Sequence, residues 1–131
     1  MIGGSERETI LVVDDDGYAR TLVAKILSQR GYTALPAADA WQAMDILQEQ
    51  SIDLIILDLR MPGPVDGEQL LNSLHDHGNV VPIIVLSGWV SDEMSLNPPD
   101  GVRTVMKKPI DIDIFAATVA HVLAQSGSGQ N

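Results

Sequence analysis

Short apolar runs alternate with longer amphipathic stretches along most of this 131-residue chain. Such alternation is typical of βαβ units, in which helices cover both faces of a parallel sheet. We therefore expect an α/β domain built on a parallel sheet. The expected strands are residues 9–13, 32–35, 53–57, 82–86 and 103–106.

Two of these runs are weaker than the others. The runs at 9–13, 53–57 and 82–86 are almost continuously apolar, as in strands that are buried on both faces. The runs at 32–35 and 103–106 are less apolar. We expect these two strands at or near the edges of the sheet.

Four helices are expected over residues 17–30, 40–50, 67–77 and 112–124. Asp16 is the expected N-cap of the first helix and Asp66 that of the third. Asp39 is the expected cap of the second, with Gln42 three residues later in capping-box spacing. Trp41 and Met44 are expected to pack that helix onto the sheet, and the three His are expected to be solvated. These are His75, His77 and His121.

The stretch from 88 to 101 is unusual because its second half cannot form a helix. The sequence Asn97-Pro98-Pro99-Asp100-Gly101 breaks any helix there, so at most two turns fit, over residues 89–96. The expected domain spans residues 8–125 and contains a short or irregular fourth helix. Residues 1–7 and 126–131 are expected to be flexible tails.

The composition excludes several classes of function. The formal net charge is −10, which argues against non-specific binding of nucleic acid or anionic membranes. No apolar run approaches the roughly 20 residues that cross a bilayer, and the first residues do not resemble a signal peptide. A cytoplasmic location is therefore expected. Because the chain has no Cys, a metal would be held by oxygen or His ligands.

Carboxylates follow two of the buried runs. Asp14 and Asp15 come directly after Ile10–Val13, and Asp58 comes directly after Leu54–Leu57. Neighbouring parallel strands end at the same edge of a sheet, where ligands bind. Carboxylates gathered there repel one another unless a hard cation is bound. The sequence thus predicts a Mg²⁺ site with one carboxylate free to react.

Two further polar residues follow the fourth and fifth expected strands. Ser87 ends the run that begins at Ile83, and Lys108 follows Met106-Lys107. A carboxylate nucleophile can accept a phosphoryl group. Its oxygens then need Mg²⁺, a cation and a hydroxyl nearby, all of which the sequence supplies.

Over roughly residues 8–125 the chain resembles the CheY-like receiver domains of response regulators in two-component signalling. The matching motifs are Ile10–Asp16, Asp53–Gly63, Ile83–Gly88 and Lys108-Pro109, in this order. The resemblance implies a flavodoxin-like (βα)5 three-layer sandwich whose five parallel strands have the order 2-1-3-4-5.

The resemblance also implies the metal ligands and the acceptor. Asp58 is the expected phosphoacceptor. Asp14 and Asp15 are the expected acidic pair that holds Mg²⁺ together with Asp58, and the backbone carbonyl of Arg60 completes the protein ligands.

The remaining roles follow in the same way. Ser87 is expected to bond a phosphoryl oxygen, Lys108 to pair with the phosphoryl group, and Pro109 to follow a cis peptide bond. The implied phosphodonor is a sensor histidine kinase, a histidine phosphotransfer protein or a small phosphodonor. Phosphorylation would switch contacts with an output domain or partner protein. The chain is expected to act as a phosphoacceptor rather than an enzyme, and as a monomer or weak dimer.

Each site residue also has a purely structural interpretation. Asp14 and Asp15 could be polar loop residues, Asp58 could accept from loop amides, Ser87 could cap a helix, and Lys108 could be a surface lysine. Two rival functions are a degenerate receiver that binds partners constitutively and a phosphatase with an Asp nucleophile. The complete set of site residues argues against the first. The second lacks a Thr soon after the first acidic cluster and a segment for a cap domain.

Two positions depart from the family pattern. The loop Met61–Gly67 is one residue longer than usual and has an extra Pro, which affects the start of the third helix. Val105, three residues before Lys108, replaces an aromatic residue that usually rotates inward, so no aromatic switch is expected. The fourth helix, the last strand and the last helix usually form the surface that partners contact in this family. Together with the broken fourth helix, the change at Val105 predicts that any dimer through this surface is weak or unlike those of relatives.

The substitution Trp89→Ala is expected to shorten the lifetime of a phosphorylated Asp58. In the family, the positions two residues after the acceptor and after the hydroxyl residue tune hydrolysis; here they are Arg60 and Trp89. A bulky indole should impede the attacking water. The measurement is the decay of the phosphorylated protein once the phosphodonor is removed, and an unchanged rate would contradict this idea.

Overall fold

Strands and helices alternate throughout the computed structural model, which describes residues 7–59, 67–88 and 90–128. In chain order the elements are β1 (Thr9–Val13), α1 (Gly17–Gln29), β2 (Thr33–Ala37), α2 (Ala40–Glu49), β3 (Leu54–Leu57), α3 (Gly67–Asp76), β4 (Ile83–Ser87), α4 (Asp92–Leu96), β5 (Val102–Lys107) and α5 (Ile112–Ser128). The expected succession of strands and helices is therefore confirmed.

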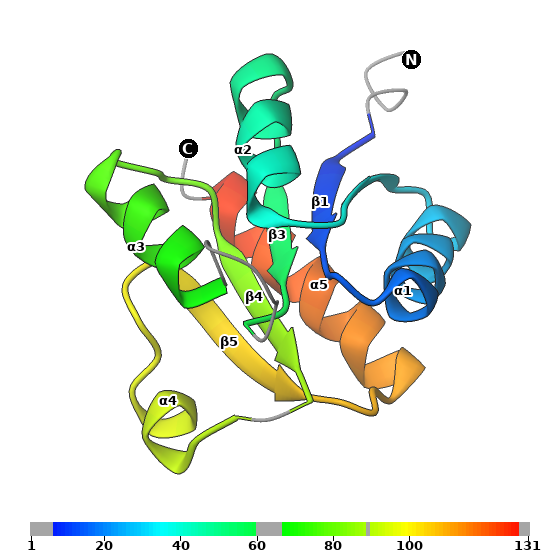
Figure 1. The fold of residues 1–131 in the computed structure, drawn as a ribbon. Helices are drawn as coiled ribbons and strands as arrows, with labels where there is room; N and C mark the ends of the chain where they lie inside the picture. The colour runs from blue at the N-terminus through cyan, green and yellow to red at the C-terminus, as the bar shows by residue number, and fades with distance from the viewer. Residues whose placement is uncertain (1–6, 60–66, 89, 129–131) are drawn as a thin grey trace.

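The strands form one parallel sheet in the order β2-β1-β3-β4-β5 (Figure 1). This order confirms the expected flavodoxin-like (βα)5 sandwich. β2 and β5 lie at the two edges, as their less apolar sequences predicted. The three central strands β1, β3 and β4 are almost entirely buried.

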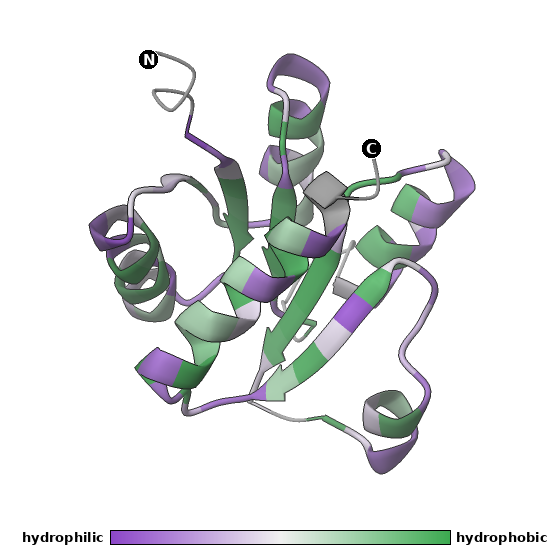
Figure 2. Cartoon of the chain, turned by 180° about the vertical axis from the view of Figure 1, so that it is seen from behind, coloured by the Kyte–Doolittle hydropathy of each residue, from purple (hydrophilic) through white to green (hydrophobic). Residues whose placement is uncertain are grey.

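Two hydrophobic cores lie on opposite faces of the sheet, because successive strand residues point to opposite sides. Leu11 and Ile55 belong to the core under α2 and α3, which we call the α2/α3 face. Ile10 and Ile56 belong to the core under α1 and α5, where Phe115 is fully buried. Seen from behind in Figure 2, the central strands are hydrophobic along their length, whereas the covering helices are only partly so.

The predicted caps of the first two helices are confirmed. An oxygen of Asp16 accepts from the N–H of Tyr18 at 3.0 Å, and an oxygen of Asp39 accepts from the N–H of Gln42 at 2.8 Å. The Gln42 side chain accepts from the N–H of Ala38, at 2.8 Å, and not from that of the cap residue. Both ends of the motif are thus satisfied, although by a variant of the strict capping box.

Helix α4 has only five residues and begins at Asp92, three residues later than predicted. Ser91 caps it by accepting from the N–H of Met94 at 3.1 Å. The helix ends before Pro98, as the proline pair requires. The predicted short fourth helix is confirmed, and it is three residues shorter at its N-terminal end than predicted.

The prediction that Trp41 packs against the sheet was wrong. Its side chain is 63% exposed, whereas Met44, one turn later, packs partly against the α2/α3 face. Ala40 and Ala43 form the buried side of α2. Because successive helix residues are turned by about 100°, the residue directly after Ala40 points away from that side.

Other expectations concern the ends of elements and the histidines. Helix α5 continues to Ser128, beyond its predicted end at residue 124, since Ala124 and Gln125 favour a helix and no Pro follows. The histidines are exposed, as predicted.

Asp66 and the loop 60–66 lie outside the described residues, as do residues 1–6 and 129–131. No helix in the described part is both long and apolar enough to cross a membrane.

Gly67 brings the start of α3 against the end of β3. Its N–H donates to the carbonyl of Leu59 at 3.2 Å. A Cβ at this position would lie 2.5 Å from the carbonyl oxygen of Asp58 and 2.5 Å from Cα of Leu59. Since both obstacles are backbone atoms, only glycine fits without moving the residue that follows the strand.

Gly67→Ala is therefore expected to destabilise the domain by about 1–3 kcal/mol, the usual cost of overpacking. Urea denaturation measures the change. Gly17→Ala is the matched control, because its Cβ would meet only the flexible end of Arg20 at 3.4 Å. Equal stability of the Gly67 variant and the unmodified protein would show that α3 can move away freely.

Candidate functional site

Five side chains predicted from the sequence to share a site lie together at the carboxyl edge of the sheet. They are Asp14, Asp15, Asp58, Ser87 and Lys108. The pairing of the strands produces this arrangement, because residues that follow neighbouring parallel strands lie side by side. The N–H of Asp58 donates to the carbonyl of Val13 at 3.0 Å and so extends the pairing of β1 with β3.

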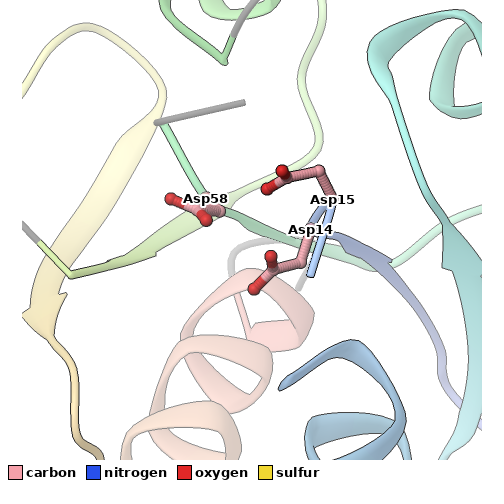
Figure 3. A group of neighbouring side chains, drawn as sticks. All are labelled: Asp14, Asp15 and Asp58. Atoms are coloured by element: carbon pink, nitrogen blue, oxygen red, sulfur yellow. The ribbon is translucent and has the colours of Figure 1, made fainter. Parts of the chain in front are cut away.

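Asp14, Asp15 and Asp58 form an acidic cluster whose carboxylate oxygens lie within 4.8 Å of one another (Figure 3). Asp14 is 4% exposed and Asp58 is 7% exposed, whereas Asp15 is open to solvent. Asp14 and Asp15 come from the end of β1, and Asp58 comes from the end of β3. The two buried carboxylates need compensation, because an ionised group is costly to remove from water unless it is paired.

Lys108 supplies part of that compensation. Its Nζ lies 2.6 Å from Oδ2 of Asp14 and 3.4 Å from Oδ2 of Asp58. The lysine is held at the end of β5, where its N–H donates to the carbonyl of Ser87 at 2.8 Å. The peptide bond between Lys108 and Pro109 is cis, as expected. The adjacent Lys107 is exposed.

Burial and pairing act in opposite directions on these two groups. Burial raises the pKa of Asp14 above its ordinary value, and the contact with Lys108 offsets this only in part. Burial by itself lowers the pKa of Lys108, but the hydrogen bond and charge of Asp14, together with the charge of Asp58, raise it above the ordinary value. The lysine therefore stays positively charged at neutral pH.

Ser87 is fully buried and donates its hydroxyl hydrogen to Oδ1 of Asp58 at 2.9 Å. It does not cap the next helix, since Ser91 has that role in α4. Of the two interpretations of this serine, the contact with the acidic cluster is the one that the structure supports.

Arg20 is a site residue that was not predicted from the sequence. Its Nη1 donates to the backbone carbonyl of Asp14 at 2.7 Å, which fixes the turn that presents the acidic pair. A second contact holds the same turn, because Oδ1 of Asp14 accepts from the N–H of Asp16 at 2.9 Å. One signal was available in the sequence. The first turn of a helix is unfavourable for a cation because the positive end of the helix dipole lies there, so Arg20 in the first turn of α1 could have been expected to have another partner.

Three predictions about the neighbourhood of the site have different outcomes. Arg60 and Trp89 lie outside the described residues. Val105 is partly buried in β5, opposite Val85 of β4, and packs against the α2/α3 face. It has no ring to rotate, so the expectation that this domain has no aromatic switch stays a prediction.

The donor set of the acidic cluster fits a hard divalent cation. Carboxylate oxygens are what Mg²⁺ and Ca²⁺ prefer, and Mg²⁺ favours sites with few carboxylates and a phosphate group. The three carboxylates lie close together, and Asp15, the exposed member, opens the cluster to solvent. The same site holds an ammonium and a hydroxyl against Asp58, a combination suited to phosphoryl oxygens.

Curated proteins with similar sequences include signalling proteins of two kinds. The CAI-1 autoinducer sensor kinase/phosphatase CqsS of Vibrio cholerae is 36% identical over 115 residues, which are 85% of this chain and 17% of that protein. Sporulation initiation phosphotransferase F of Bacillus subtilis is 32% identical over 107 residues, 81% of this chain and 86% of that protein. The chain thus spans less than a fifth of the sensor kinase but most of the phosphotransferase.

Solved structures give the same family. The receiver domain of the Francisella response regulator 1452 has a TM-score of 0.84 and 26% identity, and the match covers 92% of this chain and 99% of that one. The sequence pattern of the response regulator receiver domain family matches residues 10–120. This chain therefore belongs to the response regulator receiver domain family of two-component systems, and it is homologous to the phosphoacceptor domains of response regulators and hybrid sensor kinases.

Proposed function

We propose that Asp58 of this domain accepts a phosphoryl group in a Mg²⁺-dependent reaction. The observation that carries the proposal is the surroundings of this carboxylate: one oxygen accepts from Ser87 and the other faces Lys108, beside the acidic pair Asp14 and Asp15. Receiver domains interact with histidine kinases or histidine phosphotransfer proteins. The donor proposed here is the phosphohistidine of such a protein, or a small phosphodonor.

The transfer forms one bond to the phosphorus atom and breaks another. An oxygen of Asp58 attacks the phosphorus atom, the bond from phosphorus to the imidazole nitrogen breaks, and the nitrogen keeps the electron pair as the histidine leaves. The product is an acyl phosphate on Asp58. Lys108 is close enough to balance charge on the phosphoryl oxygens, and Ser87 can redirect its hydroxyl from the carboxylate to one of them.

Asp14, Asp15 and Asp58 would hold the metal ion, with the backbone carbonyl of Arg60 as the ligand that the family resemblance implies. Receiver domains bind Mg²⁺ through an aspartate cluster of this kind. When bound, the ion supplies positive charge that offsets the repulsion between the carboxylates and the incoming phosphoryl oxygens.

The remaining parts of the proposal concern output. Phosphorylation would shift a conformational equilibrium through the loops that carry Ser87 and Lys108, without the aromatic rotation that Val105 precludes. The functional unit is residues 8–125, which act on a partner protein or output domain as a monomer or weak dimer. Neither nucleic acid nor membrane is a proposed partner. A cytoplasmic location stays a prediction.

Incubation with acetyl phosphate and Mg²⁺ is expected to add one phosphoryl group to the protein, seen by intact mass. The adduct is expected to be absent in Asp58→Ala, because the nucleophile is removed. An adduct of equal yield in that variant would place the acceptor elsewhere.

The same samples separate the rival functions. A degenerate receiver would show no adduct even in the unmodified protein. A phosphatase would release inorganic phosphate from p-nitrophenyl phosphate with steady turnover, which a phosphoacceptor domain is not expected to do.

Asp15→Asn is expected to weaken Mg²⁺ binding by about tenfold or more, because it removes one of three clustered carboxylates. Isothermal titration calorimetry with MgCl₂ measures the affinity. Asp16→Asn is the matched control, since it loses the same charge one residue away and Asn caps a helix as well as Asp. In EDTA, Asp15→Asn is also expected to melt at a higher temperature than the unmodified protein, because less repulsion remains. Equal affinities of the two variants would contradict the assignment of Asp15.

A further inference from the structure

The net charge of the chain is distributed very unevenly. Residues 31–102 contain eleven Asp and Glu but only one Lys or Arg, Arg60, so this segment alone carries −10, the formal net charge of the whole chain. The segment forms β2, α2, β3, α3, β4 and α4. None of its described residues is a Lys or Arg. The residues outside this segment include seven Lys or Arg and seven Asp or Glu, so together they are neutral.

An apolar groove opens within this acidic half. It lies between the C-terminal parts of α2 and α3 and has a volume of about 460 Å³. Its apolar wall includes Met44, Leu47, Ile52, Leu74 and Val81. The volume falls in the range of sites that accept side chains or small ligands.

Two exposed apolar side chains lie close in the sequence to residues that line the groove. Trp41 is 63% exposed and lies one turn before Met44, on the flank of α2 that also carries Gln48 of the groove wall. Val80 is 90% exposed, between the lining residues Asn79 and Val81. From Trp41 to Gln48 the flank spans about 10 Å, or two helical turns.

The polar side chains that line the groove are those of Gln48, Gln50, Ser51, His77 and Asn79, and the charged residues next to the lining residues in the sequence are acidic. Asp45 and Glu49 of α2 and Asp76 of α3 are exposed and adjoin groove residues in the sequence. No described Lys or Arg lies on α2, α3 or the loops that complete the groove. An apolar channel with an anionic rim is complementary to an apolar stripe with cationic flanks.

We propose that this groove docks a cationic amphipathic helix of a partner protein. The helix would place apolar residues at i, i+3 or i+4, and i+7 against Met44, Leu47 and Leu74, with Lys or Arg beside Asp45 and Glu49. A second copy of this chain does not fit, since it would bring two faces of the same charge together. An anionic membrane is disfavoured for the same reason.

The docking site is separate from the phosphoacceptor. The groove residues Ile52 and Val81 precede β3 and β4, whereas Asp58 and Ser87 stand at the opposite ends of those strands. In Figure 1, α2 and α3 extend toward the edge of the sheet away from α4. A helix in the groove would therefore leave Asp58 open to its phosphodonor.

The test uses NMR titration of the ¹⁵N-labelled full chain with a synthetic helical peptide that has a Leu stripe at i, i+3, i+4 and i+7 flanked by Lys. Shifts are expected at Met44, Leu47, Leu74 and Val81, with saturation below about 1 mM. A peptide with the same Leu stripe and Glu in place of Lys is expected not to bind. Affinity for the Lys peptide should fall as salt is raised.

Two double variants distinguish the effect of the acidic residues beside the groove from the effect of the overall net charge. Asp45→Lys/Glu49→Lys is expected to weaken binding of the Lys peptide at least tenfold, whereas Glu8→Lys/Asp113→Lys, with the same change in net charge, should alter it less than about twofold. Equal loss in both variants, equal binding of the Glu peptide, or shifts centred on α1 and α5 would overturn the proposal. So would absence of binding at millimolar peptide, or a dimer through this face in sedimentation analysis.

Discussion

The ammonium group of Lys108 lies between two buried carboxylates, those of Asp14 and Asp58. A buried charge is destabilising on its own, so each of these groups depends on the others for compensation. They are far apart in the sequence and meet only because β1, β3, β4 and β5 run parallel and end at one edge. One positive charge does not balance the cluster, because Asp15 adds a third carboxylate within 4.8 Å. This imbalance is what makes the site receptive to a divalent cation.

The parts of the fold and site that could be predicted were those governed by local pattern. The apolar runs at β1, β3 and β4 identified buried strands, because residues covered on both faces have to be apolar. Asp39 could be recognised as a cap from its spacing to Gln42. The grouping of Asp14, Asp58 and Lys108 followed from their positions after the strands, since parallel strands share an edge.

The parts that could not be predicted depend on tertiary contacts. Nothing in the sequence distinguishes a tryptophan that packs from one that faces solvent, and Trp41 faces solvent. Arg20 reaches Asp14 only because the turn before α1 folds back, a geometry that side-chain spacing does not reveal. The close approach of Gly67 to Asp58 involves backbone atoms of two separate elements. The groove between α2 and α3 likewise depends on how the two helices pack against the sheet.

The position of the acidic residues has a consequence beyond the groove. Because residues 31–102 hold the entire net charge, the centre of charge is displaced from the centre of mass, and the domain has a permanent electric dipole. Approaching ions feel this field over about 10 Å at 0.1 M salt. A cationic molecule would exert a torque that turns the α2/α3 side toward it, and an anionic one would favour the α1/α5 side. Partners of opposite sign would thus meet different sides of the domain during diffusion, before any surfaces touch.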